Sequence, residues 1–335
     1  MVSRLGMALF AGLILTLATA CGEGSGAGPS SNGSAPPLVS MSPGAGLLAL
    51  PPPGTVYLGV FANPNQVPAP PPSILASFET SIGRTLALST HYYGFFDDFP
   101  GTYEADDVAH GRIPIDSWDC QPANATVAAG NDDTAIRKRA DAIKAFGHPI
   151  FLRYMWEMNL PSNSSFRHIC YDANTDLPNG YFSPQQYIAA WDRIRAIFGQ
   201  ENVTNVVWLW NPSGAKNPLN FYPGSDEVDW VGFDRYNDGN VSMSATYTQP
   251  YGWLAPLGKP IMIGETGATQ QVQQAFFGSG VSTLKTQFPL IRGFMYFDSL
   301  NIHFAGSYSW VIDSANLPTF ATMANDPYFS AMPPP

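Results

Sequence analysis

Eight short apolar runs recur from residue 56 onward, and helix-like segments alternate with them. Continuous hydrophobic strands that alternate with helices are typical of a parallel sheet. Eight such strands, over a length close to the ~250 residues of one α/β barrel, favour a single closed (β/α)8 (TIM) barrel. The predicted strands are 56–61, 86–91, 112–117, 150–157, 206–211, 230–236, 261–265 and 292–298.

Helices are predicted at 73–82, 132–146, 183–198 and 270–287. Asp132 and Ser183 each supply a side-chain oxygen that can cap a helix start, and Pro184 suits a first helical position. The connections between the fifth, sixth and seventh strands carry only weak helical signals. Short apolar runs are also weak strand signals one by one, so we expect the barrel class to be better determined than the exact number of strands.

The first 20 residues have the composition of a secretory signal peptide: Arg4, an apolar run over 5–17, and Ala18-Thr-Ala20. The run is short for a membrane span and lacks a stop-transfer flank. Leu17-Ala-Thr-Ala-Cys21 resembles a bacterial lipoprotein box, although the leucine lies four residues before the cysteine rather than three. Ala-x-Ala also suits an ordinary signal peptidase. We favour lipidation of Cys21, because a free N-terminal thiol has no evident purpose and a tether-like segment follows.

Residues 21–53 are rich in Gly, Ser and Pro and are predicted to form a linker, which leaves 54–335 as the barrel domain. Cys120 and Cys170 are the other two cysteines. In an exported chain a disulfide between them is favoured over a metal site, because neither has the usual metal-ligand spacing around it. The chain is therefore expected to be secreted or on the cell surface, as a bacterial lipoprotein. Its membrane contact would run through Cys21 alone.

The formal net charge of −10, with only 16 Lys and Arg, disfavours binding to a phosphate backbone, so nucleic acid is not an expected partner. The 8 Trp, 15 Tyr and 21 Phe include several near predicted strand ends, where their faces can stack on sugar rings. No phosphate-binding glycine loop, HExxH or dinucleotide motif is present, so no cofactor and no metal are expected. We expect a monomer.

Polar residues close most of the predicted strands, where a barrel carries its active site. Asp and Asn at such positions also serve as ordinary turn residues. Glutamate is no turn former, and Glu157 and Glu265 each end an apolar run. Burying both without partners would cost several kcal/mol. Strand periodicity predicts Arg153, Met155 and Glu157 on one face. The polar strand ends are His91, Asp116, Glu157, Asn211, Asp234 with Tyr236, Glu265 and Asp298.

Two facing glutamates suit cleavage of a glycosidic bond. One, kept protonated by its neighbour's charge, protonates the leaving oxygen, and the other attacks the anomeric carbon. A separation of about 5 to 5.5 Å between them would give retention of configuration.

Three segments carry a resemblance to glycoside hydrolase family 26, the β-mannanase-like enzymes of the retaining (β/α)8 clan A. They are Arg153-Tyr-Met-Trp-Glu157-Met-Asn159, the region from Phe221 to Tyr236, and Lys259-Pro-Ile-Met-Ile-Gly-Glu265. The resemblance spans most of 56–331. It implies that Glu157 is the acid/base, that Glu265 is the nucleophile and that Tyr236 contacts Glu265 or the sugar beside it.

The same resemblance implies that Asp234 contacts sugar hydroxyls. Arg153 belongs to the motif that resembles the family's fourth strand. The remaining candidate substrate-binding residues are Trp156, His91, Trp210 and Phe297. Trp156 stands where the family has a histidine, Ser162 stands where it has an aromatic platform, and Phe297 or Tyr296 stands where it often has a tryptophan. These departures affect contacts with the sugar more than the carboxylates.

The expected function is an endo-acting hydrolase of β-1,4-linked polysaccharide, most of all β-mannan. A β-glucanase or xylanase on the same fold is the alternative, and a glycan-binding lipoprotein without turnover is the alternative of another class.

Overall fold

The structure is a computed structural model that describes residues 50–67, 70–162, 170–237, 239, 241–300 and 309–333. All of them belong to the compact unit Val39–Pro335. The predicted signal peptide, Cys21 and the linker up to residue 49 lie outside the described residues. None of the described helices has both the length and the apolar character needed to cross a membrane.

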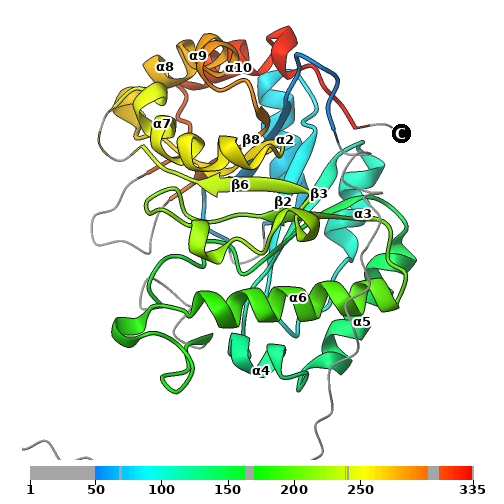
Figure 1. Cartoon of the computed structure of the whole chain (residues 1–335). Helices are drawn as coiled ribbons and strands as arrows, with labels where there is room; N and C mark the ends of the chain where they lie inside the picture. The colour runs from blue at the N-terminus through cyan, green and yellow to red at the C-terminus, as the bar shows by residue number, and fades with distance from the viewer. Residues whose placement is uncertain are drawn as a thin grey trace, which may run out of the picture. The chain divides into compact units, whose positions relative to one another are not determined.

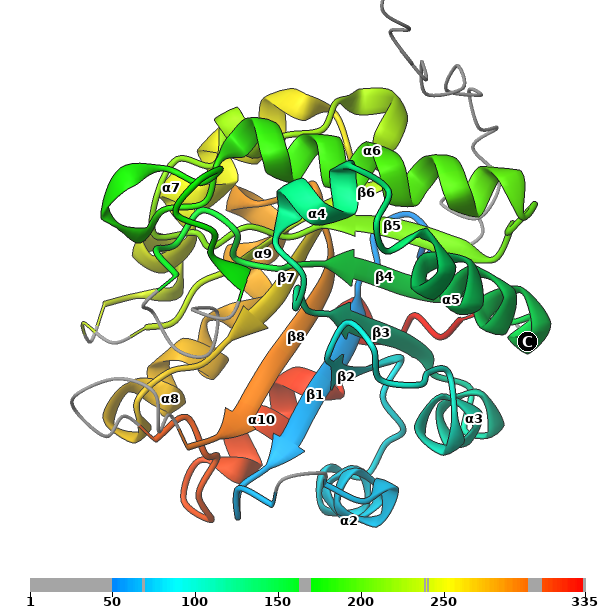
Figure 2. The same ribbon diagram turned by 90° about the horizontal axis from the view of Figure 1, so that it is seen from below.

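Eight parallel strands form one closed barrel in sequence order, and β8 pairs with β1 to close it (Figure 2). All eight predicted strands are present, so the (β/α)8 fold is confirmed. Their ends differ from the predicted ones by one to three residues. The strands are β1 (Tyr57–Asn63), β2 (Leu88–Tyr93), β3 (Ile113–Trp118), β4 (Ile150–Tyr154), β5 (Val206–Trp210), β6 (Trp230–Asp234), β7 (Ile261–Thr266) and β8 (Ile291–Ser299).

Helices surround the barrel, as Figures 1 and 2 show from two directions. Three of them follow the prediction closely: α2 (Pro72–Ile82), α5 (Asp133–Phe146) and α6 (Pro184–Gln200). Between β5 and β6 the chain forms only the 3-10 turns η3 (Leu219–Phe221) and η4 (Ser225–Glu227). The other helices are α3 (Thr102–Ala109), α4 (Asn124–Ala128), α7 (Met243–Leu254), α8 (Gln270–Gly278), α9 (Gly280–Gln287) and α10 (Leu317–Ala324).

Two local predictions about helices need correction. The single helix predicted at 270–287 is two helices, α8 and α9, which break at Ser279 between Gly278 and Gly280; glycine on both sides weakens helix propagation there. Ser183 caps α6 as predicted, by accepting from the Gln186 backbone N–H. Asp132 occupies the equivalent position before α5, but its side chain makes no capping bond.

Two hydrophobic layers set the direction of each side chain. On β5, Val207 and Leu209 belong to a cluster contributed by all eight strands, which fills the barrel. Trp208 and Trp210 point the other way and pack in the cluster beneath the helices. This alternation decides which residues beyond the core reach the interior of the barrel mouth, at the carboxyl ends of the strands.

The barrel domain starts a few residues earlier than predicted. Pro51 is buried, and the Arg292 guanidinium donates to the carbonyls of Pro51 and Pro52 at 2.6 and 2.9 Å. Arg292 lies at the start of β8, so the chain enters the domain at the end of the barrel where the strands begin.

Candidate active site

Glu265 lies near the end of β7, inside the barrel mouth, and its carboxylate has three donors among the described residues. Arg153 Nη2 and the Tyr92 hydroxyl donate to Oε1 at 2.6 and 2.8 Å, and the Tyr236 hydroxyl donates to Oε2 at 2.6 Å. The three donors come from β2, β4 and the residues following β6. The carboxylate is therefore fixed in orientation by three different parts of the barrel wall.

A bulge in β7 aims this carboxylate inward. Met262 fills the barrel, so strict alternation would point Gly264 inward and Glu265 outward. The pairing register between β6 and β7 shifts after Phe233, which places Asp234 opposite Glu265. A bulge inserts one residue and redirects the next side chain. Gly264 is also required here, because a Cβ atom on it would lie 2.0 Å from the side-chain oxygen of Asn211.

Arg153 is the cation at the centre of the site, and its side chain is fully buried. Its Nε donates to Ser117 Oγ at 2.6 Å, and its Nη1 lies 3.5 Å from both oxygens of Asp234. Burial opposes its charge, but the carboxylates of Glu265 and Asp234 more than offset that effect and raise the pKa of Arg153. The guanidinium therefore stays charged at every working pH.

Asp234 is a buried carboxyl on β6 beside this guanidinium. Burial and the charge of Glu265 raise its pKa well above the ordinary value, and Arg153 opposes this shift. The charge of Glu157 acts in the same direction as that of Glu265, so Glu157 belongs to the same electrostatic cluster.

Glu157 follows β4 in a turn rather than in the strand, which corrects the predicted end at 157. Met155 and Glu157 both have left-handed backbones, with φ of 45° and 55°, a conformation that costs non-glycine residues about 1 kcal/mol or more each. Their backbone N–H groups donate to the carbonyls of Trp118 and Asn211, each at 2.8 Å. The bonds tie this turn to β3 on one side and to the end of β5 on the other.

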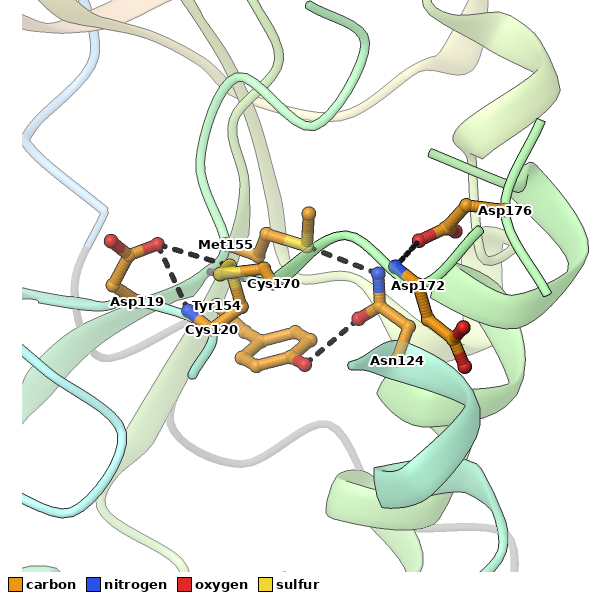
Figure 3. The surroundings of a disulfide bond; sticks show 8 residues. All are labelled: Asp119, Cys120, Asn124, Tyr154, Met155, Cys170, Asp172 and Asp176. Carbon is orange, nitrogen blue, oxygen red and sulfur yellow. Dashed lines mark hydrogen bonds between the residues drawn. A yellow bond between two sulfur atoms is a disulfide. The ribbon is translucent and has the colours of Figure 1, made fainter. Parts of the chain in front are cut away.

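The predicted common face of Arg153, Met155 and Glu157 is therefore wrong. Arg153 points into the barrel, whereas the Met155 sulfur accepts from Asn124 Nδ2 of α4 at 3.2 Å, on the helix side of the wall (Figure 3). The left-handed residues break the strand alternation before it reaches Glu157.

Aromatic rings surround the Glu265 carboxylate. The Tyr92 ring lies 5.3 Å from Trp156 and 5.3 Å from Phe61, which stacks on Phe297 at 4.8 Å. Trp156 also lies 5.3 Å from the Arg153 guanidinium. The Tyr236 ring lies 5.9 Å from Phe297 and stacks on Trp310 at 5.1 Å. Of the predicted substrate-binding residues, the structure thus brings together Arg153, Trp156, Asp234, Tyr236 and Phe297 around Glu265.

His91 and Trp210 do not join this group. His91 Nε2 bonds Asp107 Oδ2 of α3 at 2.7 Å, on the helix side of β2; the next residue, Tyr92, is the one that points inward. Trp210 is completely buried beneath the helices, where it packs on Tyr222 at 5.0 Å. Both were predicted to contact substrate, and strand alternation turns both away from the mouth.

Two of the polar strand ends are also directed outward. Asp116 is buried on the α3 side of β3. Asp298 accepts from the Ile312 backbone N–H at 2.7 Å and holds the segment that follows β8. Burial raises the pKa of Asp298 to about 7, and the Ile312 bond limits the rise.

The structure joins Cys120 and Cys170 in a disulfide, the pair that the sequence predicted (Figure 3). It links the residues after β3 to a segment that follows β4. Within the same view, Asn124 accepts from the Tyr154 hydroxyl at 2.9 Å and donates to Met155. The disulfide and this amide thus hold the chain on either side of the turn that carries Glu157.

The closed barrel and the carboxyl groups at its mouth define the class of protein by its fold, a (β/α)8 barrel with a polar site at the carboxyl ends of its strands. Residues 178–298 match the model of glycosyl hydrolase family 26, so this part of the chain is similar to that family. That region contains Asp234, Tyr236 and Glu265, whereas Arg153 and Glu157 precede it.

Two curated relatives frame the comparison. Endoglucanase H of Acetivibrio thermocellus is 27% identical over 217 residues, which are 60% of this chain and 23% of that protein. A mannan endo-1,4-beta-mannosidase of Thermothelomyces thermophilus is 36% identical over 87 residues, 25% of this chain and 16% of that protein. The matches thus span a quarter or less of the curated relatives' length.

Solved structures agree on the fold. The YdhT protein from Bacillus subtilis superimposes with a TM-score of 0.59 at 17% identity, covering 84% of this chain and 88% of its own. The Bacillus subtilis mannanase BCman gives a TM-score of 0.56 at 16% identity, covering 82% of this chain and 86% of its own.

Proposed function

We propose that this protein is a retaining endo-β-1,4-glycanase that hydrolyses β-mannan. The observation that carries the proposal is the fixed Glu265 carboxylate, which two tyrosines and a guanidinium hold inside the mouth of the barrel. Donors of this kind fix the orientation of a carboxylate, as a nucleophile requires.

In the proposed reaction, Glu265 attacks the anomeric carbon while Glu157 gives a proton to the departing glycosidic oxygen. A glycosyl ester of Glu265 forms. Glu157, now a carboxylate, takes a proton from water as the water oxygen attacks the same carbon, and Glu265 is released. Asp234 and Arg153 orient the sugar and the nucleophile, while Phe297 and Trp156 supply apolar surface beside them.

Cellulose-type β-glucan is the second candidate substrate, because one curated relative is named as an endoglucanase while others are named as mannanases. Trp156 and Phe297 are the departures from the family pattern that lie beside Glu265, so they are where a different sugar would be selected. We also propose that the chain is exported and anchored through Cys21, in line with its disulfide.

Release of reducing ends from mannan, glucomannan, β-glucan, cellulose and xylan tests the activity and ranks the substrates. Glu265→Gln and Glu157→Gln should each lower kcat on the best polysaccharide by roughly 10³-fold or more, on the scale of losses at catalytic nucleophiles and bases. Asp172→Asn, on an exposed turn, is the matched control and should retain full activity.

The outcomes separate the classes of function. Binding to a polysaccharide without any release of reducing ends would favour the glycan-binding alternative over an enzyme. Wild-type turnover that survives in both glutamine variants would contradict the assigned roles of the two glutamates.

A further inference from the structure

Tyr92 is the only residue of the His91-Tyr92-Tyr93 sequence that reaches Glu265. His91 bonds Asp107, and the Tyr93 hydroxyl donates to Glu104; both partners belong to α3. Tyr92 points to the other face of β2, where its hydroxyl donates to Glu265 Oε1 at 2.8 Å and accepts from Arg153 Nη2 at 3.2 Å. Phe61 and Trp156 pack against its ring and fix its direction.

These contacts make the two oxygens of Glu265 unequal. A carboxylate oxygen can accept about two hydrogen bonds. Within the described chain, Oε1 accepts both from Arg153 and from Tyr92, whereas Oε2 accepts only from Tyr236. The acceptor capacity of Oε1 is therefore filled, and Oε2 retains one open direction.

We propose that Tyr92 is a positioning residue that makes Oε2 of Glu265 the attacking atom and assists its later departure. This inference rests on the proposed function. In the first step the Oε2–C1 bond forms, the C1–oxygen bond to the leaving group breaks, and the Glu157 proton goes to that oxygen. In the second step water adds to C1, its proton goes to Glu157, and the electron pair of the C1–Oε2 bond returns to Glu265.

Tyr92 affects the two steps differently, because the charge on Oε1 changes. In the glycosyl ester Oε1 is a neutral carbonyl oxygen and a weaker acceptor than in the carboxylate. As the C1–Oε2 bond breaks, negative charge returns to both oxygens, so the Tyr92 hydroxyl stabilises that transition state more than the ester. In the first step the charge is lost rather than gained, and the same bond gives no acceleration.

The test is Tyr92→Phe in the full chain, with Tyr93→Phe as the matched control, since the Tyr93 hydroxyl donates to Glu104 on the helix side. The substrate is a dinitrophenyl β-glycoside of the disaccharide unit that the wild type releases. We expect kcat of Tyr92→Phe to fall about 10- to 100-fold, the fold-change for a lost hydrogen bond to a charged group. KM should fall by a similar factor, so that kcat/KM, which reports the first step, changes little.

Intact-protein mass spectrometry during turnover should show the glycosyl ester accumulating in Tyr92→Phe. The control Tyr93→Phe should match the wild type in kcat, in kcat/KM and in the amount of ester. Preserved kcat/KM also demonstrates an intact fold. Unchanged kcat, or a fall in kcat/KM without ester accumulation, overturns the role of Tyr92 and leaves the proposed function standing. Absence of wild-type turnover on every polysaccharide overturns the proposed function and this inference with it.

Discussion

Two groups of buried carboxyls lie on opposite faces of the same barrel wall. The two groups differ in the cations and hydrogen-bond donors that offset the cost of burying them. At the mouth, Glu265 and Asp234 surround the single guanidinium of Arg153. On the helix side, Asp107 is bonded to Arg112 and His91, whereas neither oxygen of its neighbour Asp116 accepts a hydrogen bond from the described residues. On the helix side, a cation in direct contact distinguishes Asp107 from Asp116, whereas at the mouth the guanidinium that Glu265 and Asp234 share does not offset the effect of burial on the pKa of Asp234.

The shifts in pKa follow this division. Burial raises the pKa of Asp107, but its bonds to His91, Ser89 and Arg112 outweigh burial and bring the pKa below the ordinary value. At Asp116, burial and the charges of Glu104 and Asp107 act together and raise the pKa well above it. A protonated Asp116 can donate to Glu104, whose carboxylate already accepts from Tyr93 and from the Gly101 backbone.

The largest expected effect comes from removing the shared cation. Arg153→Met leaves Glu265 and Asp234 buried without their partner and should lower the free energy of unfolding by about 3–5 kcal/mol. Urea unfolding followed by circular dichroism measures the change. The double variant Arg153→Met/Glu265→Gln should recover part of the loss, because glutamine removes one of the two buried carboxyl groups. An unfolding midpoint of Arg153→Met equal to that of wild type would show that Arg153 does not offset the burial of Glu265 and Asp234.

A smaller loss is expected at the compensated carboxyl of the helix side. Asp107→Asn should lower stability at pH 7 by about 2 kcal/mol, the scale of hydrogen bonds to charged groups. Because its folded pKa is depressed, the contribution of Asp107 is complete above the unfolded value of 3.8 and is lost as pH falls through the folded pKa. The difference in stability between Asp107→Asn and wild type should therefore shrink as pH falls below about 4.

Replacement of Asp116 should raise stability rather than lower it, and this is the smallest of the three expected changes. Its raised pKa means that the unfolded chain releases the proton above about pH 4 while the folded protein keeps it, so wild-type stability declines as pH rises toward the folded pKa. Asp116→Asn removes that decline, so the variant should gain stability relative to wild type between pH 4 and pH 7, as measured by urea unfolding. Parallel pH profiles for Asp116→Asn and wild type would show that Asp116 is already ionised in the folded protein.

The strand pattern and the polar residues at strand ends were sufficient to predict the barrel and the position of Glu265 at its mouth. They were insufficient to predict which side chains of each strand point into the barrel and which point toward the helices. The sequence of β2, Leu-Ser-Thr-His-Tyr-Tyr, has no alternation of apolar and polar residues, so nothing marks Tyr92 rather than His91 as the inward residue. Around Glu265 and Glu157 the alternation fails physically, through the bulge in β7 and the left-handed turn after β4. Both are set by pairing with neighbouring strands, which a single chain segment does not encode.

The helical signal was weak in the two connections between β5, β6 and β7, for a different reason in each. Between β5 and β6 the chain forms only short 3-10 turns. Between β6 and β7 a helix is present, but α7 contains Pro250 and mixes polar with aromatic residues, so its apolar face is poorly defined in the sequence. Trp210 was misplaced because an aromatic residue near a strand end has the same appearance whether it faces sugar or helix.

The bonds from Arg292 to Pro51 and Pro52 have a mechanical consequence. They fix the point of entry of the chain at the pole of the barrel where the strands begin, whereas Glu265 lies at the other pole. A force applied to the chain before Pro51 is thus transmitted to the pole opposite Glu265.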